Sequence, residues 1–153
     1  MKRPRSFTGS YTAIVTPFRR GAEELYLGVM PQSWIDRYGD AGWLNRRGEG
    51  KGNLTAIEQA AQLVALAHAQ RLTVSITLNA PAYTAAQLPE IVELVGQLAE
   101  IGVDGLIITD PGLMLTLRAA GSRLAVKASS VAALCVAGSP APSGGASRDL
   151  KIL

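Results

Sequence analysis

The sequence predicts an α/β fold built on parallel β-strands. From residue 55 onward, signals for helices and strands alternate along the chain with short connections, which is typical of βαβ units. The two clearest strands begin at Leu72 and Gly105, and their separation of 33 residues is a usual period for such a unit. With 153 residues, 48% of them apolar and 18% charged, the composition is that of one soluble globular domain without a membrane-spanning run.

A helix is predicted first, over residues 55–70, because Thr55 and Glu58 have the spacing of a capping box. Its apolar residues are expected near one helical face, and they are Ile57, Leu63, Val64, Leu66 and Ala67. A strand is predicted over residues 72–78, where apolar and polar residues alternate. The turn residues Asn79 and Pro81 end this strand.

The elements that follow are predicted from the same kinds of signal. A second helix comes after the capping pattern Thr84 to Gln87, with apolar residues three and four apart and Gly102 as a stop. A short apolar strand after it is typical of the fully buried strands of parallel sheets. The predicted ranges are 87–101 for this helix, 104–109 for the strand, 112–120 for a further helix and 123–127 for a further strand.

Two strands are also predicted upstream, at Tyr11–Thr16 and Glu24–Val29. The polar, glycine-rich stretch at residues 31–53 is longer than an ordinary βα connection, so we expect it to be functional or partly mobile. Near the C-terminus, residues 137–147 have the composition of a linker, which predicts a disordered tail. The expected organisation is a basic N-terminal segment at 1–20, a domain at 21–136 and a low-complexity tail at 137–153.

Charge and cysteine content exclude several kinds of partner. Residues 1–20 carry five basic and no acidic side chains, whereas the other 133 residues carry ten basic and twelve acidic ones. The body of the protein is therefore not expected to bind nucleic acid. The single cysteine, Cys135, excludes an internal disulfide, a four-cysteine zinc site and a self-contained iron–sulfur cluster. We expect a cytoplasmic protein with no metal, no cofactor and no membrane partner.

A series of segments, in order along residues 21–134, resembles a known enzyme family. They are Glu24–Val29, Trp34, Trp43–Gly48, Asn53–Leu54, Thr77–Pro81, Gly102–Asp110 and Ala128–Ser130. Together they resemble the N-terminal part of the collagenase-like peptidases of unknown catalytic type, peptidase family U32. The resemblance implies a TIM-like (β/α) barrel, present here as about half a barrel, and peptidase activity on a peptide or another small substrate.

The sequence also departs from this family. Relatives that act in RNA or quinone hydroxylation carry a cysteine cluster that is missing here, so the resemblance does not extend to their iron–sulfur chemistry. Lys127 stands where members often have a histidine. Full-length members continue well beyond this chain. We therefore expect a truncated peptidase. The alternative is an inactive fragment that forms a homo-oligomer or pairs with a complementing subunit.

A shorter segment, residues 7–18, resembles the first strand of the dihydrodipicolinate synthase family of Schiff-base lyases. The threonine-rich loop and the tyrosine that this family uses later in its chain have no counterpart here. A lyase is therefore the second alternative function, in which Lys127 would be the amine that forms the Schiff base. The other interpretation of Lys127 is a solvated lysine at a strand edge.

Residues at the carboxyl ends of strands are the catalytic candidates, because the loops of a barrel converge there. They are Asn79, Asp110 and Ser129. Asn79 is a donor to a substrate carbonyl or a turn residue, and Asp110 is a general base or the cap of the helix at Pro111. Ser129 needs a base, and the only histidine, His68, is expected at a helix end or on the surface. No Ser-His-Asp triad is predicted.

Substrate binding is predicted for a polar loop. Asn45, Arg46 and Arg47 lie between tryptophan and glycine residues, and two adjacent arginines can grip a carboxylate or phosphate through paired donors. The alternative is a solvated basic loop. Tyr26, in the predicted strand at 24–29, completes the predicted substrate-binding set.

Overall fold

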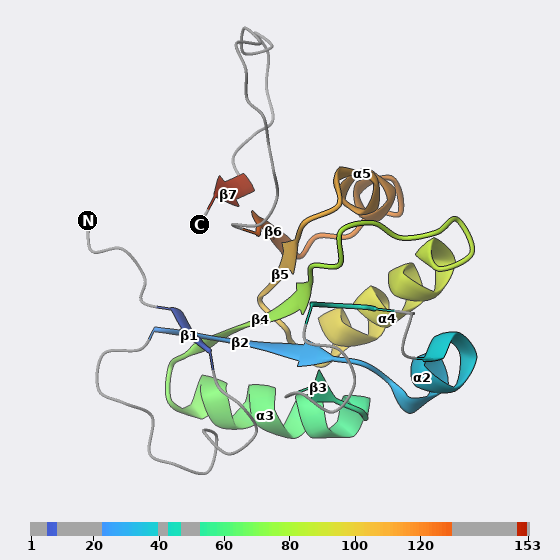
Figure 1. The fold of residues 1–153 in the computed structure, drawn as a ribbon. Helices are drawn as coiled ribbons and strands as arrows, with labels where there is room; N and C mark the ends of the chain where they lie inside the picture. The colour runs from blue at the N-terminus through green and yellow to red at the C-terminus, as the bar shows by residue number, and fades with distance from the viewer. Residues whose placement is uncertain (1–5, 9–22, 40–42, 47–52, 130–149, 153) are drawn as a thin grey trace, which may run out of the picture.

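The computed structural model describes residues 6–8, 23–39, 43–46, 53–129 and 150–152. Its strands are parallel and form one sheet in the order β1-β2-β4-β5-β6-β7 (Figure 1). The central strands are β2 (Glu24–Val29), β4 (Thr73–Leu78), β5 (Gly105–Ile108) and β6 (Ala125–Ala128). Each pairs with the one before it in this list. The predicted α/β fold is confirmed, and its topology is that of part of a (β/α) barrel.

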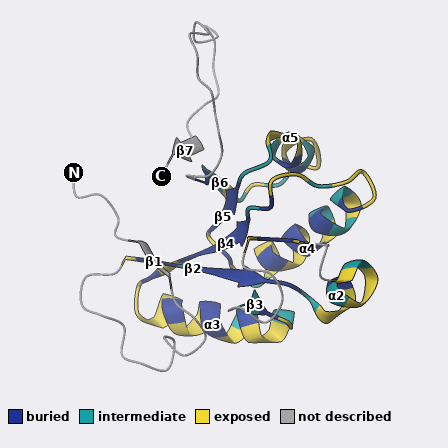
Figure 2. Cartoon of the chain, in the orientation of Figure 1, coloured by how far each residue is buried: buried dark blue, intermediate teal, exposed yellow. Residues whose placement is uncertain are grey.

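Three helices connect the central strands, and each lies within two residues of its predicted range: α3 (Ile57–Ala69), α4 (Leu88–Glu100) and α5 (Pro111–Ala119). They lie on one side of the sheet, with their buried residues toward it (Figure 2). Leu66, expected on the buried face of α3, is instead 53% exposed. At 3.6 residues per turn it lies about 200° around the helix from Val64, so it faces away from the sheet.

The two faces of the sheet differ in chemistry. The face toward the helices is apolar and forms the core with them: Leu25, Leu27, Val29, Val74, Ile76, Leu78, Leu106 and Ile108. Successive side chains of a strand point to opposite faces, so the residues between these lie on the other face. That face, called here the inner face because it corresponds to a barrel interior, includes the buried polar residues Glu24, Ser75 and Thr77. Polar groups therefore concentrate on the inner face.

The stretch at residues 31–53 contains a helix that the sequence analysis does not predict. This helix, α2 (Gln32–Tyr38), has a buried Trp34 that belongs to the core. The rings of Trp34 and Tyr38, one turn apart, have centroids 4.5 Å from each other. Gly39 follows with a φ of 57°, a conformation that glycine adopts without strain, and the helix ends there. The glycine-rich character of the stretch therefore applies only to the residues after α2.

The outer strands lie near the two ends of the chain. β1 (Ser6–Thr8) pairs with β2, and β7 (Leu150–Ile152) pairs with β6. For Leu150–Ile152 the structure differs from the predicted disordered tail, because the alternation of apolar and polar residues in this triplet suits a strand. The predicted strand at residues 11–16 and residues 137–149 of the tail lie outside the described residues.

One short strand lies off the main order of the sheet. β3 (Asn53–Leu54) pairs with the end of β2, at Gly28 and Val29. The longest described helices, α3 and α4, have 13 residues each. Within the described part of the chain, no helix has both the length and the apolar character needed to cross a membrane.

Candidate functional site

The carboxyl ends of the strands meet at one edge of the sheet, which we call the carboxyl edge. The register aligns the last residues of β4, β5 and β6. The residues that follow therefore lie side by side, and they are Asn79, Thr109 and Ser129, with Asp110 one residue further. The structure brings the three predicted catalytic residues to the same edge, while their roles stay predictions.

Asn79 connects the edge to the predicted substrate-binding loop. Its Oδ1 accepts a hydrogen bond from the backbone N–H of Arg46 at 3.1 Å. Its backbone carbonyl accepts one from the hydroxyl of Thr109 at 3.3 Å. Its amide nitrogen Nδ2 has no hydrogen-bond partner among the described residues, so this group is available as a donor to a ligand.

Asp110 holds two backbone groups with its carboxylate. One oxygen accepts a hydrogen bond from the N–H of Gly112 at 2.8 Å, and this contact makes Asp110 the cap of α5. The other oxygen accepts one from the N–H of Tyr83 at 3.2 Å. The capping interpretation is confirmed. Each oxygen retains a further lone pair, so the geometry leaves room for proton transfer as well.

The loop at residues 43–46 lies over the end of β2. Asn45 is fully buried, and its Nδ2 donates to Oδ1 of Asn53 at 2.7 Å. Gly28 faces this pair, because a Cβ at Gly28 would lie 1.9 Å from Oδ1 of Asn53. Asn45 therefore supports the loop from beneath, whereas Arg46 is exposed at its surface.

The remaining predicted residues are half-buried, buried or outside the described residues. Tyr26 is half-buried in β2, and its register partner Ser75 lies on the inner face. Ser129 is buried, and its N–H donates to the carbonyl of Ile108 at 2.8 Å. Arg47 lies outside the described residues.

Lys127 is not the solvated lysine of the sequence analysis. Its side chain is 16% exposed, and its ammonium group donates to the carboxylate of Glu24 on the inner face. The hydroxyl of Ser75 also donates to Oε1 of Glu24, at 2.5 Å, and lies 3.2 Å from Nζ of Lys127. Sequence reasoning missed Glu24 and Ser75, although the alternation of their strands places both on the polar face. These three residues form a largely buried polar cluster across β2, β4 and β6.

A comparison with models of protein families decides which family the chain belongs to. The model of peptidase family U32 matches residues 9–139 of this chain. The chain belongs to peptidase family U32. The match is longer at both ends than the resemblance over residues 21–134. It includes residues 9–18, which make up most of the segment that resembles the Schiff-base lyases.

A structural comparison agrees with this membership. The U32 chain is similar to the solved structure of the U32 peptidase Mk0906, with a TM-score of 0.55 and 16% sequence identity. The similarity covers 86% of this chain and 50% of that one, so the chain spans half the length of this solved relative. At such low identity the likeness shows the fold alone. No curated protein matches the chain.

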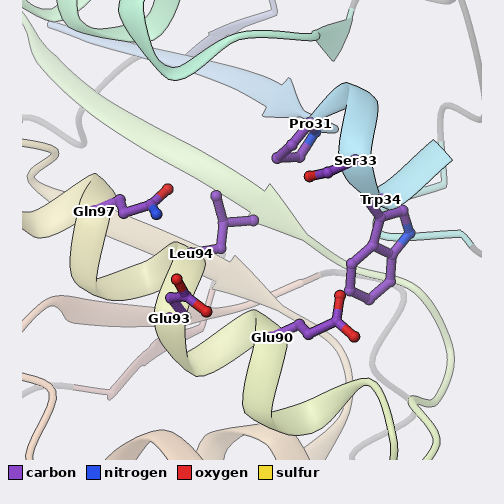
Figure 3. Close-up of a pocket in the computed structure, with 7 residues that line it drawn as sticks. All are labelled: Pro31, Ser33, Trp34, Glu90, Glu93, Leu94 and Gln97. Carbon is purple, nitrogen blue, oxygen red and sulfur yellow. The ribbon is translucent and has the colours of Figure 1, made fainter. Parts of the chain in front are cut away.

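Other polar features of the U32 chain lie away from the carboxyl edge. His68, in the last turn of α3, contacts Asp104 at 2.9 Å, and Asp104 precedes β5, so this pair lies at the opposite edge of the sheet. A groove between α2 and α4 is lined by Pro31, Ser33, Trp34, Glu90, Glu93, Leu94 and Gln97 (Figure 3). Among the described residues, no three histidine, cysteine or carboxylate side chains lie close enough together to hold a metal ion.

Proposed function

We propose that the carboxyl edge of this U32 chain binds a peptide and hydrolyses it with water as the nucleophile. Membership of the family supports a peptidase function. The observation that carries the proposal is the docking of the loop at residues 43–46 on Asn79. This docking places an exposed arginine beside the amide donor of Asn79, on the edge of the sheet that also carries the Asp110 carboxylate.

Each of these groups has one role in the proposed reaction. Nδ2 of Asn79 donates to the carbonyl oxygen of the scissile peptide bond, where negative charge develops. Asp110 accepts a proton from water as the water oxygen bonds to the carbonyl carbon. The same proton then passes to the amine nitrogen as the carbon–nitrogen bond breaks. The guanidinium of Arg46 binds a carboxylate of the substrate.

The substitution Asp110→Asn tests the proposed base. Asparagine keeps an oxygen that can accept from the N–H of Gly112 and is as good a helix cap as aspartate, but its amide cannot take a proton. Its NH2 group also cannot accept the hydrogen bond that the N–H of Tyr83 gives to the second carboxylate oxygen. We expect cleavage of a fluorogenic peptide library to fall roughly 100-fold or more, the usual contribution of a general base. Circular dichroism checks that the variant is folded.

Asp104→Asn is the matched control at the opposite edge of the sheet. Asp104 also accepts a backbone hydrogen bond, from the N–H of Val74 at 2.7 Å, so both variants lose one charged acceptor of a backbone group. We expect the control to retain full activity. Equal cleavage by the parent chain and Asp110→Asn would contradict the proposed base. Binding of labelled peptide without any cleavage by the parent chain would favour the inactive, complementing subunit.

A further inference from the structure

Tyr83 links parts of the carboxyl edge that are distant in sequence. Its hydroxyl donates a hydrogen bond to the carbonyl oxygen of Leu44 at 2.7 Å and accepts one from the N–H of Ala80 at 3.2 Å. Its own backbone N–H donates to Oδ2 of Asp110 at 3.2 Å. Leu44 lies 39 residues before Tyr83, so one side chain ties the loop at residues 43–46 to the connection between β4 and α4.

The contact with Leu44 acts on the substrate-binding groups next to it. Two residues after Leu44, the N–H of Arg46 donates to Oδ1 of Asn79. Because this oxygen is engaged, the orientation of the Asn79 amide is set, and Nδ2 is the group left for a ligand. A displacement of the Leu44 carbonyl would therefore change the positions of both Arg46 and Asn79.

The Tyr83 hydroxyl suits this linking role because it donates and accepts at the same time. Leu44 is fully buried, so its carbonyl needs a hydrogen-bond donor from the protein. Burial raises the pKa of Tyr83 above its ordinary value, so the hydroxyl keeps the proton that it donates. A phenylalanine ring could fill the same space but could make neither hydrogen bond.

We propose that Tyr83 is a positioning residue: it holds the loop at residues 43–46 on Asn79 and so sets how Arg46 and Asn79 meet the substrate. The catalytic part of this inference rests on the proposed function. The hydrogen bond from Tyr83 to Asp110 is made by the backbone N–H of Tyr83, which a side-chain substitution leaves in place. Removal of the hydroxyl is therefore expected to weaken both substrate binding by Arg46 and oxyanion stabilisation by Asn79, and to spare proton transfer by Asp110.

The substitution Tyr83→Phe tests the inference with two separate measurements. Amide hydrogen exchange followed by NMR reports on the N–H of Arg46, whose protection depends on the docked loop. We expect this amide to exchange roughly fivefold faster, the effect of about one lost hydrogen bond. In peptide cleavage we expect kcat/KM to fall by at least this factor, because Arg46 binds the substrate and Asn79 stabilises the developing oxyanion, while the pH dependence of kcat stays that of the parent because Asp110 keeps its place.

Tyr38→Phe is the matched control, because the Tyr38 hydroxyl contacts Glu90 at 2.6 Å and the carbonyl oxygen of Ala86 at 3.5 Å, and neither of these residues touches the loop at residues 43–46. We expect this variant to leave Arg46 exchange and kcat/KM unchanged. Parent-like exchange of the Arg46 amide in Tyr83→Phe would overturn the inference, as would a parent-like kcat/KM. If the parent chain cleaves no peptide, the proposed function fails, and the exchange measurement still decides whether Tyr83 positions the loop.

Discussion

Gly28 shows how one missing side chain shapes the carboxyl edge. Asn53 occupies the space beside Gly28, with Oδ1 only 1.9 Å from where a Cβ would lie, and the Asn45 amide nitrogen is 2.7 Å from the same point. The Asn45–Asn53 hydrogen bond, and with it the buried base of the loop at residues 43–46, therefore depends on glycine at this position.

We expect Gly28→Ala to displace Asn53 and to break its buried hydrogen bond with Asn45. Overpacking by the added methyl together with the loss of this hydrogen bond costs about 1–3 kcal/mol, so the free energy of unfolding in urea should fall by about that amount. Gly96→Ala is the control, because Gly96 lies on the exposed side of α4 with no atom within 4 Å of the added methyl. That change should stabilise the helix by about 0.5–1 kcal/mol. Equal stability of Gly28→Ala and the parent would refute the prediction.

Lys127 and Glu24, in the cluster with Ser75, form the only ion pair among the described residues in which both side chains are largely buried. Removing one partner leaves the other charge buried without compensation, which costs about 3–5 kcal/mol. We therefore expect Lys127→Met and Glu24→Leu each to lower the free energy of unfolding by about this amount. The double variant should lose much less than the sum, because neither charge remains. Additive losses in a denaturant-based double-mutant cycle would show that the pair is not coupled.

At the scale of helices and strands, the sequence predicts the repeating units well because local signals agree with the packing. The capping pattern before α4 is a clear case: Oε1 of Gln87 accepts a hydrogen bond from the N–H of Thr84 at 2.8 Å. The corresponding pattern before α3 does not form, because α3 begins at Ile57 and the N–H of Thr55 donates to Gln59 instead. Spacing alone predicts both helices, but before α4 only the hydrogen bond from Thr84 to Gln87 forms, and α4 begins at Leu88 without a side-chain cap.

The helix α2 could have been found from its own residues. Trp34, Ile35 and Tyr38 have helical spacing, Pro31 precedes the helix and Gly39 ends it, but polar and glycine-rich residues dominate the rest of the stretch. Seven residues also give little local signal. The tertiary contacts of α2 with α4, from Arg37 and Tyr38 to Glu90, are not visible in a local pattern.

The candidate site is predictable from the sequence only where the topology decides it. Because Asn79, Asp110 and Ser129 follow predicted parallel strands, the strand pattern alone places all three at one edge of the sheet. The contacts that organise the edge join distant residues, such as Tyr83 with Leu44, 39 positions apart. The ion pair of Lys127 and Glu24 spans 103 positions. Such pairings depend on the register of the whole sheet, and nothing in a single strand specifies them.

The docking of α2 on α4 should depend on pH through Glu90. A hydrogen bond from the Tyr38 hydroxyl and the nearby Arg37 guanidinium lower the pKa of Glu90 below its ordinary 4.5. A carboxyl group with a lowered folded-state pKa stabilises the fold above pH 4.5, and this contribution disappears as the pH falls through the folded-state pKa. In an NMR titration we expect Tyr38→Phe and Arg37→Gln each to raise the Glu90 pKa toward its ordinary value. An unchanged titration curve in both variants would contradict the contacts seen between these helices.

At the scale of the whole molecule, the sheet has two outer strands and does not close on itself within the described residues. β1 and β7 each pair on one side only, with β2 and β6 respectively. The helices cover one face of the sheet (Figure 1). The inner face carries the cluster of Glu24, Ser75 and Lys127. In a closed barrel, other strands would cover the edges and enclose this polar face.

Open parallel edges present unpaired backbone N–H and C=O groups, which are templates for pairing with another chain. We therefore propose that copies of this chain associate, and we expect the purified protein to form oligomers whose mass in light-scattering chromatography rises with concentration. Because association that requires the folded chain also stabilises it, the midpoint of thermal unfolding should rise over the same range. Association of unfolded chains would instead lower the midpoint or remove the cooperative transition. A compact monomer that unfolds cooperatively, with one midpoint over a roughly hundredfold range of concentration, would show that the half-barrel is stable on its own and needs no partner at its edges.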